Sequence, residues 1–155
     1  MAVQRLAFAA LALLAALSIY SLGVASQRFG DAAQTFDRIE LELAGFNYER
    51  GSQTVAFALR VDNPGRNDAR VTFIEYAFVI NGVVAGGGDA RPGATIPPGE
   101  SLVLDLQGRI NDVRYVERQP TDEPLGWLVN ARIQVNVDER LDSAFIPFSF
   151  RTETP

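Results

Sequence analysis

The sequence predicts an all-β domain, an antiparallel β-sandwich of about seven strands, behind one N-terminal hydrophobic helix. Three observations support this prediction. Residues Leu6–Ala25 contain no charged residue and no proline, apolar and polar residues alternate through most of the chain after them, and turn signals recur about every ten residues. The chain divides accordingly into an N-terminal segment, residues 1–30, and one domain, residues 31–155, which is long enough for a single hydrophobic core.

The apolar run Leu6–Ala25 is long enough for a membrane-spanning helix, because at ~1.5 Å per residue it covers roughly 30 Å. Two interpretations stay open: an uncleaved anchor, which the length favours, and a signal peptide cleaved before Ser26 or Gln27. The many alanines weaken an anchor, since alanine is only mildly apolar. Arg5 precedes the run, so the positive-inside rule places the N-terminus in the cytoplasm and the domain outside the cell membrane. After cleavage the domain would be secreted or periplasmic.

Strand patterns follow one another through the domain. Alternation of apolar and polar residues predicts strands over residues 39–43, 46–48, 55–61, 71–80, 83–85, 102–106, 127–137 and 145–150. The alternation changes phase between Phe73 and Ile74, which predicts a β-bulge there. Pro147 favours an edge position for the last strand, because it has no N–H to pair. Residues 110–119 interrupt the pattern and predict a short helix or an irregular crossover.

Three turn motifs connect these strands. Asn63-Pro64-Gly65 places proline and glycine at the central positions of a type II turn, with the asparagine side chain able to cap it. Asn81-Gly82 is the strongest short hairpin signal in the chain and predicts a type I′ turn. Pro98-Gly99 precedes the next strand as a third turn. Gly86-Gly87-Gly88 resembles a phosphate-binding loop, but no helix or lysine follows it, so a flexible loop is favoured.

The composition excludes most catalytic and metal-binding chemistry. The chain has no Cys and no His, and all 14 basic residues are Arg. The thiolate and imidazole ligands, the usual general base and the P-loop lysine are therefore missing. An enzyme would have to work with carboxylates, arginines and hydroxyls, as glycosidases do. We expect no catalytic residue, no cofactor and no bound metal.

Acidic residues supply the candidates for metal binding or acid–base catalysis. A loop with Asp62, Asn67 and Asp68 is a candidate calcium site. The pairs Glu40 with Glu42 and Asp138 with Glu139 are candidates for acid–base catalysis. The loop spacing matches no EF-hand pattern, so a simple turn is favoured. The first pair alternates with a buried face and is predicted to be solvated, and the second pair lies at a strand end. None of the three predicts a reactive site.

Aromatic residues and net charge indicate which partners suit the domain. Trp127, Phe145, Phe148 and Phe150 would form a partner-binding patch if exposed, although aromatic residues at strand spacing are more often core. Residues 31–155 carry 12 of the arginines and all 19 acidic residues, a net charge of −7. Such a surface repels nucleic acid, so we expect no nucleic-acid partner.

Residues 55–88, VAFALRVDNPGRNDARVTFIEYAFVINGVVAGGG, resemble the water stress and hypersensitive response (WHy) domain. This domain belongs to the folded, atypical late embryogenesis abundant (LEA type 2) proteins. The shared pattern is an alternating strand that ends in Asn63-Pro64, then a strand over Tyr76–Ile80, then the turn Asn81-Gly82. Residues 96–101 and 146–148 fit later parts of the pattern, so the resemblance covers about residues 36–150. Gly65 stands where the family often has asparagine.

The resemblance implies a fibronectin type III/immunoglobulin-like sandwich, a role in desiccation or water-stress tolerance, and no catalytic residues. We therefore expect a membrane-tethered, extracytoplasmic, LEA-like protein that protects proteins or the envelope without catalysis. Its partners would be a membrane, through Leu6–Ala25, and protein clients. The alternative is an adaptor or accessory subunit that binds one specific protein through an edge of the sandwich. An enzyme that relies on acidic residues alone is the least favoured.

Overall fold

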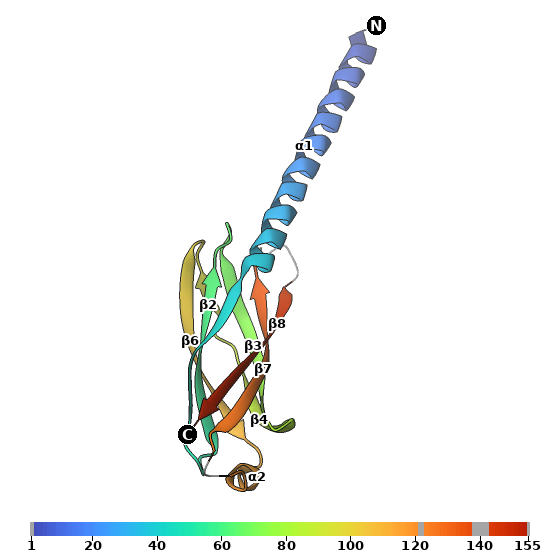
Figure 1. Cartoon of the computed structure of the whole chain (residues 1–155). Coiled ribbons are helices and arrows are strands. Elements are labelled where there is room, and N and C mark those ends of the chain that lie inside the picture. Colours follow the sequence, from blue (N-terminus) through green and yellow to red (C-terminus); the bar gives the residue numbers. More distant parts are fainter. Residues whose placement is uncertain (1, 121–122, 138–142, 155) are drawn as a thin grey trace.

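The computed structural model describes residues 2–120, 123–137 and 143–154. A long helix leads into a strand-rich domain (Figure 1). The elements, in chain order, are α1 (Ala2–Arg38), β1 (Glu40–Tyr48), β2 (Thr54–Asn63), β3 (Ala69–Ile80), β4 (Val83–Ala90), β5 (Ala94–Ile96), β6 (Glu100–Ile110), α2 (Val113–Glu117), β7 (Leu125–Asn136) and β8 (Ala144–Thr154). The predicted all-β domain behind an N-terminal helix is confirmed, and α2 is the short helix expected within residues 110–119.

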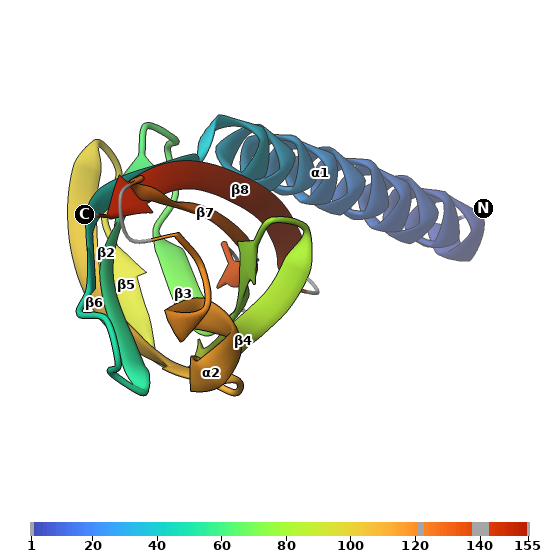
Figure 2. The same ribbon diagram turned by 60° about the horizontal axis from the view of Figure 1, so that its bottom comes forward.

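All eight strands belong to one antiparallel sheet. Their order is β1-β2-β6-β4-β3-β7-β8, and β5 pairs with β3. A short ladder between β4 and β6, which pairs Gly86 with Ile110 and Gly87 with Arg109, joins the β1-β2-β6 part to the β4-β3-β7-β8 part. The two layers of the predicted sandwich therefore continue into each other and curl around one interior as an open barrel, which Figure 2 shows from below.

The predicted bulge lies in β3. The register of β3 with β7 shifts between Val71 and Phe73, next to the phase change in the sequence. The extra residue lets Val71 and Ile74, three positions apart, both point into the core, where each is fully buried. Pro147 lies on β8, at one end of the strand order, so its predicted edge position is also confirmed.

The interior of the sheet holds one hydrophobic core. Phe78 is fully buried near its centre. Its ring makes edge contacts with Phe57, at 5.8 Å between centroids, and with Phe46 and Trp127, at 6.2 Å each. Edge-to-face contacts of this kind add to the stabilisation that burial of the rings supplies.

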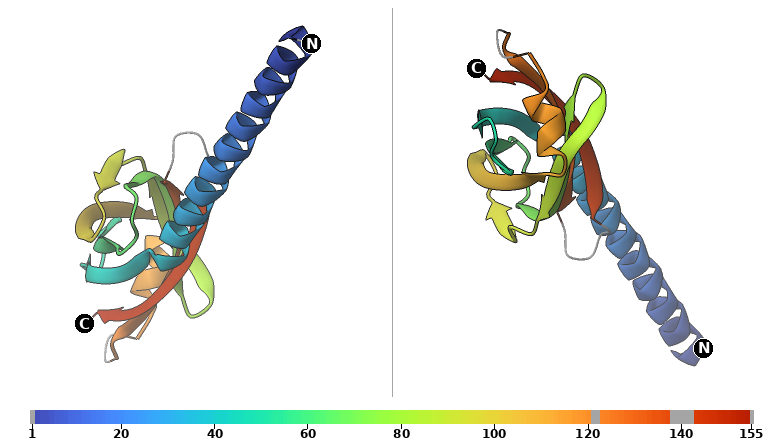
Figure 3. Two further views of the ribbon diagram at one scale, coloured as in Figure 1. Left: turned by 90° about the horizontal axis from the view of Figure 1, so that it is seen from above. Right: turned by 90° about the horizontal axis from the view of Figure 1, so that it is seen from below.

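Helix α1 projects from the domain, and only its last turns contact it (Figures 1 and 3). Ala32 is 1% exposed and Thr35 is fully buried, and Ile39 alone separates the helix from β1. Six large apolar side chains farther from the domain are 56–73% exposed: Leu13, Leu14, Leu17, Ile19, Tyr20 and Leu22. Within the described residues, no helix has both the length and the hydropathy of a membrane span. The anchor over Leu6–Ala25 stays a prediction.

Candidate functional site

Asn63, at the end of β2, makes several hydrogen bonds from a buried position. The residue is 1% exposed. Its Nδ2 donates to the backbone oxygens of Asn67 and Ile96, at 2.8 Å each, and its Oδ1 accepts from the backbone N of Gly65 at 3.1 Å. Its own backbone oxygen accepts from the N of Gly99 at 2.7 Å. One buried residue thus joins the β2–β3 loop to the segment between β5 and β6.

Gly65 allows helix α1 to pack on this loop. A Cβ at Gly65 would lie 2.5 Å from Cγ2 and 2.7 Å from Oγ1 of Thr35. Thr35 is fully buried, and its hydroxyl donates to the backbone oxygen of Asp31 at 3.0 Å, inside the helix. The predicted capping by Asn63 is confirmed. The type II turn predicted at Pro64-Gly65 is wrong, because Gly65 has no positive φ; here glycine permits close approach rather than an unusual backbone conformation.

The type II turn lies at Pro98-Gly99 instead. Gly99 has φ of +76°, and the N of Glu100 donates to the oxygen of Pro97 at 3.1 Å. Proline followed by a positive-φ glycine is the arrangement that this turn requires. Two of the three motif turns, Asn63-Pro64-Gly65 and Pro98-Gly99, are therefore brought together at the end of the barrel where α1 docks.

The third motif turn lies at the opposite end of β3. Asn81 and Gly82 have φ of +51° and +79°, so the predicted type I′ hairpin is confirmed. The Nδ2 of Asn81 donates to Oε1 of Gln119 at 2.8 Å, and Nε2 of Gln119 donates to the oxygen of Tyr115 at 3.1 Å. The hydroxyl of Tyr115 donates to the oxygen of Ile80 at 3.2 Å. This turn therefore holds α2 and the residues after it against the barrel.

The glycines at positions 86 to 88 form part of strand β4, so the predicted flexible loop is wrong. A Cβ on Gly86 or Gly87 would overlap the backbone of β6 or β3, and one on Gly88 would lie 2.9 Å from the Tyr76 ring. The Tyr76 hydroxyl donates to the oxygen of Gln107 at 2.6 Å, and burial, with a smaller contribution from the charge of Asp89, raises its pKa. These glycines are needed where the two layers meet.

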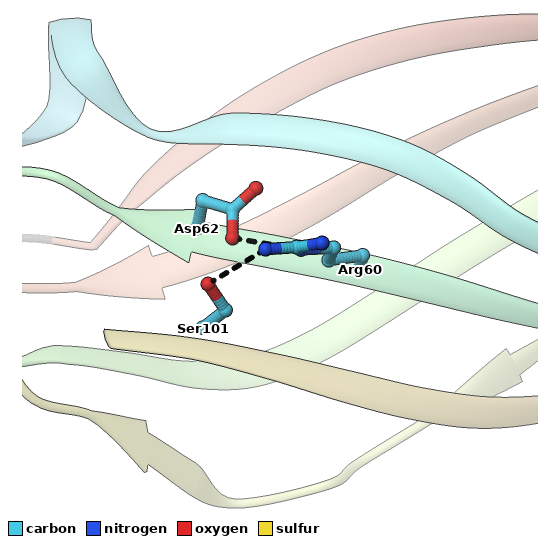
Figure 4. Close-up of polar contacts among 3 residues, drawn as sticks. All are labelled: Arg60, Asp62 and Ser101. Carbon is cyan, nitrogen blue, oxygen red and sulfur yellow. Dashed lines mark hydrogen bonds and ion pairs between the residues drawn. The ribbon is translucent and has the colours of Figure 1, made fainter. Parts of the chain in front are cut away.

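A small polar cluster lies on the outer face of β2 and β6 (Figure 4). Nε of Arg60 contacts Oδ1 of Asp62 at 3.0 Å, and Nη2 of Arg60 donates to Oγ of Ser101 at 3.3 Å. A hydrogen bond with the Ser101 hydroxyl, and then the Arg60 charge, hold the pKa of the Asp62 carboxyl below its ordinary value. Both members of the ion pair reach solvent, so the contribution to stability is small.

The aromatic candidates are mostly core, as their spacing favoured. Trp127 is 2% exposed, and its Nε1 donates to Oγ1 of Thr154 at 2.9 Å. Phe148 and Phe150 pack partly buried against the core, with ring centroids 5.2 Å apart. Phe145 is the exception: it is 48% exposed, and its ring lies 5.0 Å from the Arg132 guanidinium. These four aromatic residues therefore do not form one exposed patch.

The acidic candidates show no shared site. Glu40 and Glu42 are exposed on the outer face of β1, as predicted, and Asp138 and Glu139 lie outside the described residues. Among the residues that the structure describes, no group of three or more acidic side chains is arranged to hold a metal ion. Two surface depressions, of about 640 and 620 Å³, each contain a single carboxylate, that of Glu153 or Asp105. Neither presents the facing pair that a glycosidase needs.

Comparison with known proteins identifies the fold but assigns the chain to no family. No family model matches the sequence, and no curated protein matches it. A solution structure of a candidate LEA protein is similar over 87% of this chain and 84% of its own, with a TM-score of 0.58 and 15% identity. A protein from Arabidopsis thaliana is similar over 74% of this chain and 76% of its own length, with a TM-score of 0.52 and 20% identity. A protein from Archaeoglobus fulgidus is similar over 76% of this chain and 98% of its own length, with a TM-score of 0.51 and 17% identity. The chain has the fold of these proteins.

Proposed function

We propose that this chain is a non-catalytic protective protein of the LEA type, built on a WHy-like domain, which limits the aggregation of other proteins during water stress. The observation that carries the proposal is the fold shared with a candidate LEA protein over 87% of this chain. The pattern residues support it: Asn63 of the Asn-Pro motif is a buried structural residue, and Asn81-Gly82 forms the hairpin. The roles of these residues in the fold are structural.

The surface of the domain supports a mechanism of many weak contacts. Residues 31–155 have a net charge of −7, and the outer faces of β1 and β6 present Glu40, Glu42 and Asp105 to solvent. A charged surface keeps the protein dispersed, together with any partly unfolded client that it contacts. Such protection needs no metal, nucleotide or added cofactor.

The proposal includes a tether to a membrane. The exposed apolar side chains of α1, from Leu13 to Leu22, form a surface of the kind that marks a contact with a membrane or a protein. The uncharged run Leu6–Ala25 favours the membrane, with the domain on the outer side. Fractionation of cells followed by N-terminal sequencing tests this step. We expect the chain in the membrane fraction with residues 1–26 retained. A soluble chain that begins at Ser26 or Gln27 would show cleavage and a secreted or periplasmic domain.

The decisive experiment measures protection. The full-length chain is dried or frozen with an unrelated enzyme, and the aggregated fraction is compared with that of the enzyme mixed with an equal mass of albumin. We expect less aggregation than with albumin, without metal or nucleotide. Replacing one exposed acid, such as Asp105→Asn, should leave protection unchanged, because a diffuse surface charge does not depend on one group.

Two results would contradict the proposal. Protection no better than albumin gives, together with one partner recovered reproducibly by crosslinking in cells, would favour the adaptor hypothesis. Loss of the function on replacement of a single carboxylate would favour an enzyme.

A further inference from the structure

Strands β1 and β8 leave a seam in the wall of the barrel. They lie at the two ends of the strand order, and within the described residues no ladder joins them. In Figure 1, β1 (cyan) leaves the base of α1 and β8 (dark red) runs toward the C-terminus beside the end of β1. Each strand therefore has one edge whose backbone N–H and C=O groups lack a strand partner, which makes each edge a template for another strand.

The side chains beside the seam are less covered than the rest of the core. Inward residues of β2, such as Val55 and Leu59, are fully buried. Six inward residues of the two seam strands pack against the same core but are only partly buried: Leu41, Leu43 and Phe46 on β1, and Ile146, Phe148 and Phe150 on β8. The seam thus exposes apolar surface that one more strand would cover.

One end of the seam is closed. Tyr48, the last residue of β1, makes an edge contact with the Trp127 ring, with ring centroids 4.9 Å apart. Trp127 in turn donates a hydrogen bond to Thr154, the last residue of β8. An added strand would therefore lie beside the first half of β1, around Leu41 and Leu43.

The two edges differ in what they accept. Pro147 removes one N–H from β8, which makes that edge a poor template. The β1 edge keeps its donors, and its outer face carries Glu40 and Glu42. A second copy placed in register on this edge would set glutamate opposite glutamate, and like charges directly opposite destabilise a strand pair. Basic residues there would be stabilised instead.

We propose that the β1 edge binds an extended polypeptide segment in which apolar and basic residues alternate. The segment lies as an additional strand beside Leu41 and Leu43. Its apolar side chains point into the seam, its basic side chains lie opposite Glu40 and Glu42, and its backbone pairs with the free edge. This inference rests on the proposed function, because it names the client segment that a protective domain would hold.

A labelled ten-residue peptide of alternating valine and lysine tests the inference. Its binding to the full-length chain in mild detergent is followed by fluorescence anisotropy. Two analogues carry N-methyl groups on one or the other set of alternate amides, and a third replaces every lysine with glutamate. Strand addition uses only the amides that face β1. We therefore expect one methylated analogue to bind like the parent, and the other and the glutamate peptide to bind at least tenfold more weakly.

Charge reversal locates the site. E40K/E42K should bind the glutamate peptide more tightly than the lysine peptide. The control D89K/D105K makes the same change in net charge on β4 and β6, and should keep the parent preference. Equal binding of all methylated peptides, an equal reversal by the control, or no binding by the parent peptide would each overturn the inference. A chain that binds no peptide but still protects a dried enzyme would refute the seam site alone. Peptide binding without protection would refute the proposed function.

Discussion

Gly65 and Gly82 lie in turns at opposite ends of the barrel, and glycine is needed at each for a different reason. Gly82 has φ of +79°, and a Cβ there would meet nothing within 4 Å. Gly65 has no positive φ, but a Cβ there would lie 2.5 Å from Thr35 of helix α1. At Gly82 glycine is needed for the local backbone conformation of the hairpin. At Gly65 glycine is needed for the contact between the loop and helix α1, so a substitution there changes how the helix packs.

The largest expected effect comes from the residue that organises the Gly65 end. Asn63→Ala removes the donor for the buried oxygen of Ile96 and the partly buried oxygen of Asn67, and the acceptor for the buried N of Gly65. Each buried group left without a partner costs about 1–3 kcal/mol, so we expect unfolding in urea to require about 3 kcal/mol less. Asn67→Ala is the matched control and should change the free energy of unfolding by about 0.5 kcal/mol or less. Equal effects would show that Asn63 does not hold this end together.

Gly65→Ala tests the contact with the helix directly. Overpacking against a buried, β-branched threonine should lower the free energy of unfolding by about 2 kcal/mol. Thr35→Ala removes Cγ2 and Oγ1, so the double variant should recover about 1 kcal/mol of that loss. The measurement is a double-mutant cycle in denaturant. If the changes in the free energy of unfolding caused by the two substitutions simply add, the two residues do not interact.

Gly82→Ala provides the opposite case, with backbone strain and no clash. We expect a loss of about 1 kcal/mol in the free energy of unfolding, because an L-residue with a Cβ is strained in the left-handed region. Asparagine tolerates that region, so Gly82→Asn should be nearly neutral. Gly65→Asn should be at least as costly as Gly65→Ala, since both add a Cβ. Thermal melting of the four variants is sufficient, and similar rescue by asparagine at both positions would remove the distinction.

The smallest expected effect concerns the surface cluster. The pKa of Asp62 is lowered in the folded chain, so its carboxylate stabilises the fold above its ordinary pKa, and this is lost as pH falls through the lowered value. Ser101→Ala removes the largest cause of the shift. It should cost less than about 1 kcal/mol at pH 7, and the difference from the parent should disappear as the pH falls through the lowered pKa of Asp62. A difference that does not depend on pH would show that Ser101 acts through packing.

The sequence predicted the features that depend on neighbouring residues. Alternation located the strands, the phase change at Phe73 located the bulge, and Asn81-Gly82 located a hairpin whose two φ angles are set by the turn itself. Gly65 and the glycines at 86 to 88 were misinterpreted, because their need for glycine comes from distant partners: Thr35 in one case, and the backbones of β3 and β6 in the other. No local pattern encodes a contact between segments that are far apart in the chain.

The seam could not be predicted either, although every residue beside it was placed on a strand. Leu41, Leu43 and Phe148 have the same alternation as residues of interior strands. Their partial exposure arises because β1 and β8 are the end strands of the order, which depends on the pairing of the whole sheet. Pro147 was the one local sign of an edge, and it identified β8 correctly.

The direct passage from α1 into β1 has a hydrodynamic consequence. A helix of 37 residues is about 55 Å long, and Ile39 is the only residue between this helix and β1. With Ala32 and Thr35 buried at its base, the helix and the barrel should rotate in solution as one elongated particle. Rotational diffusion will therefore be anisotropic. Gel filtration of the monomer will report an apparent mass above 16.9 kDa.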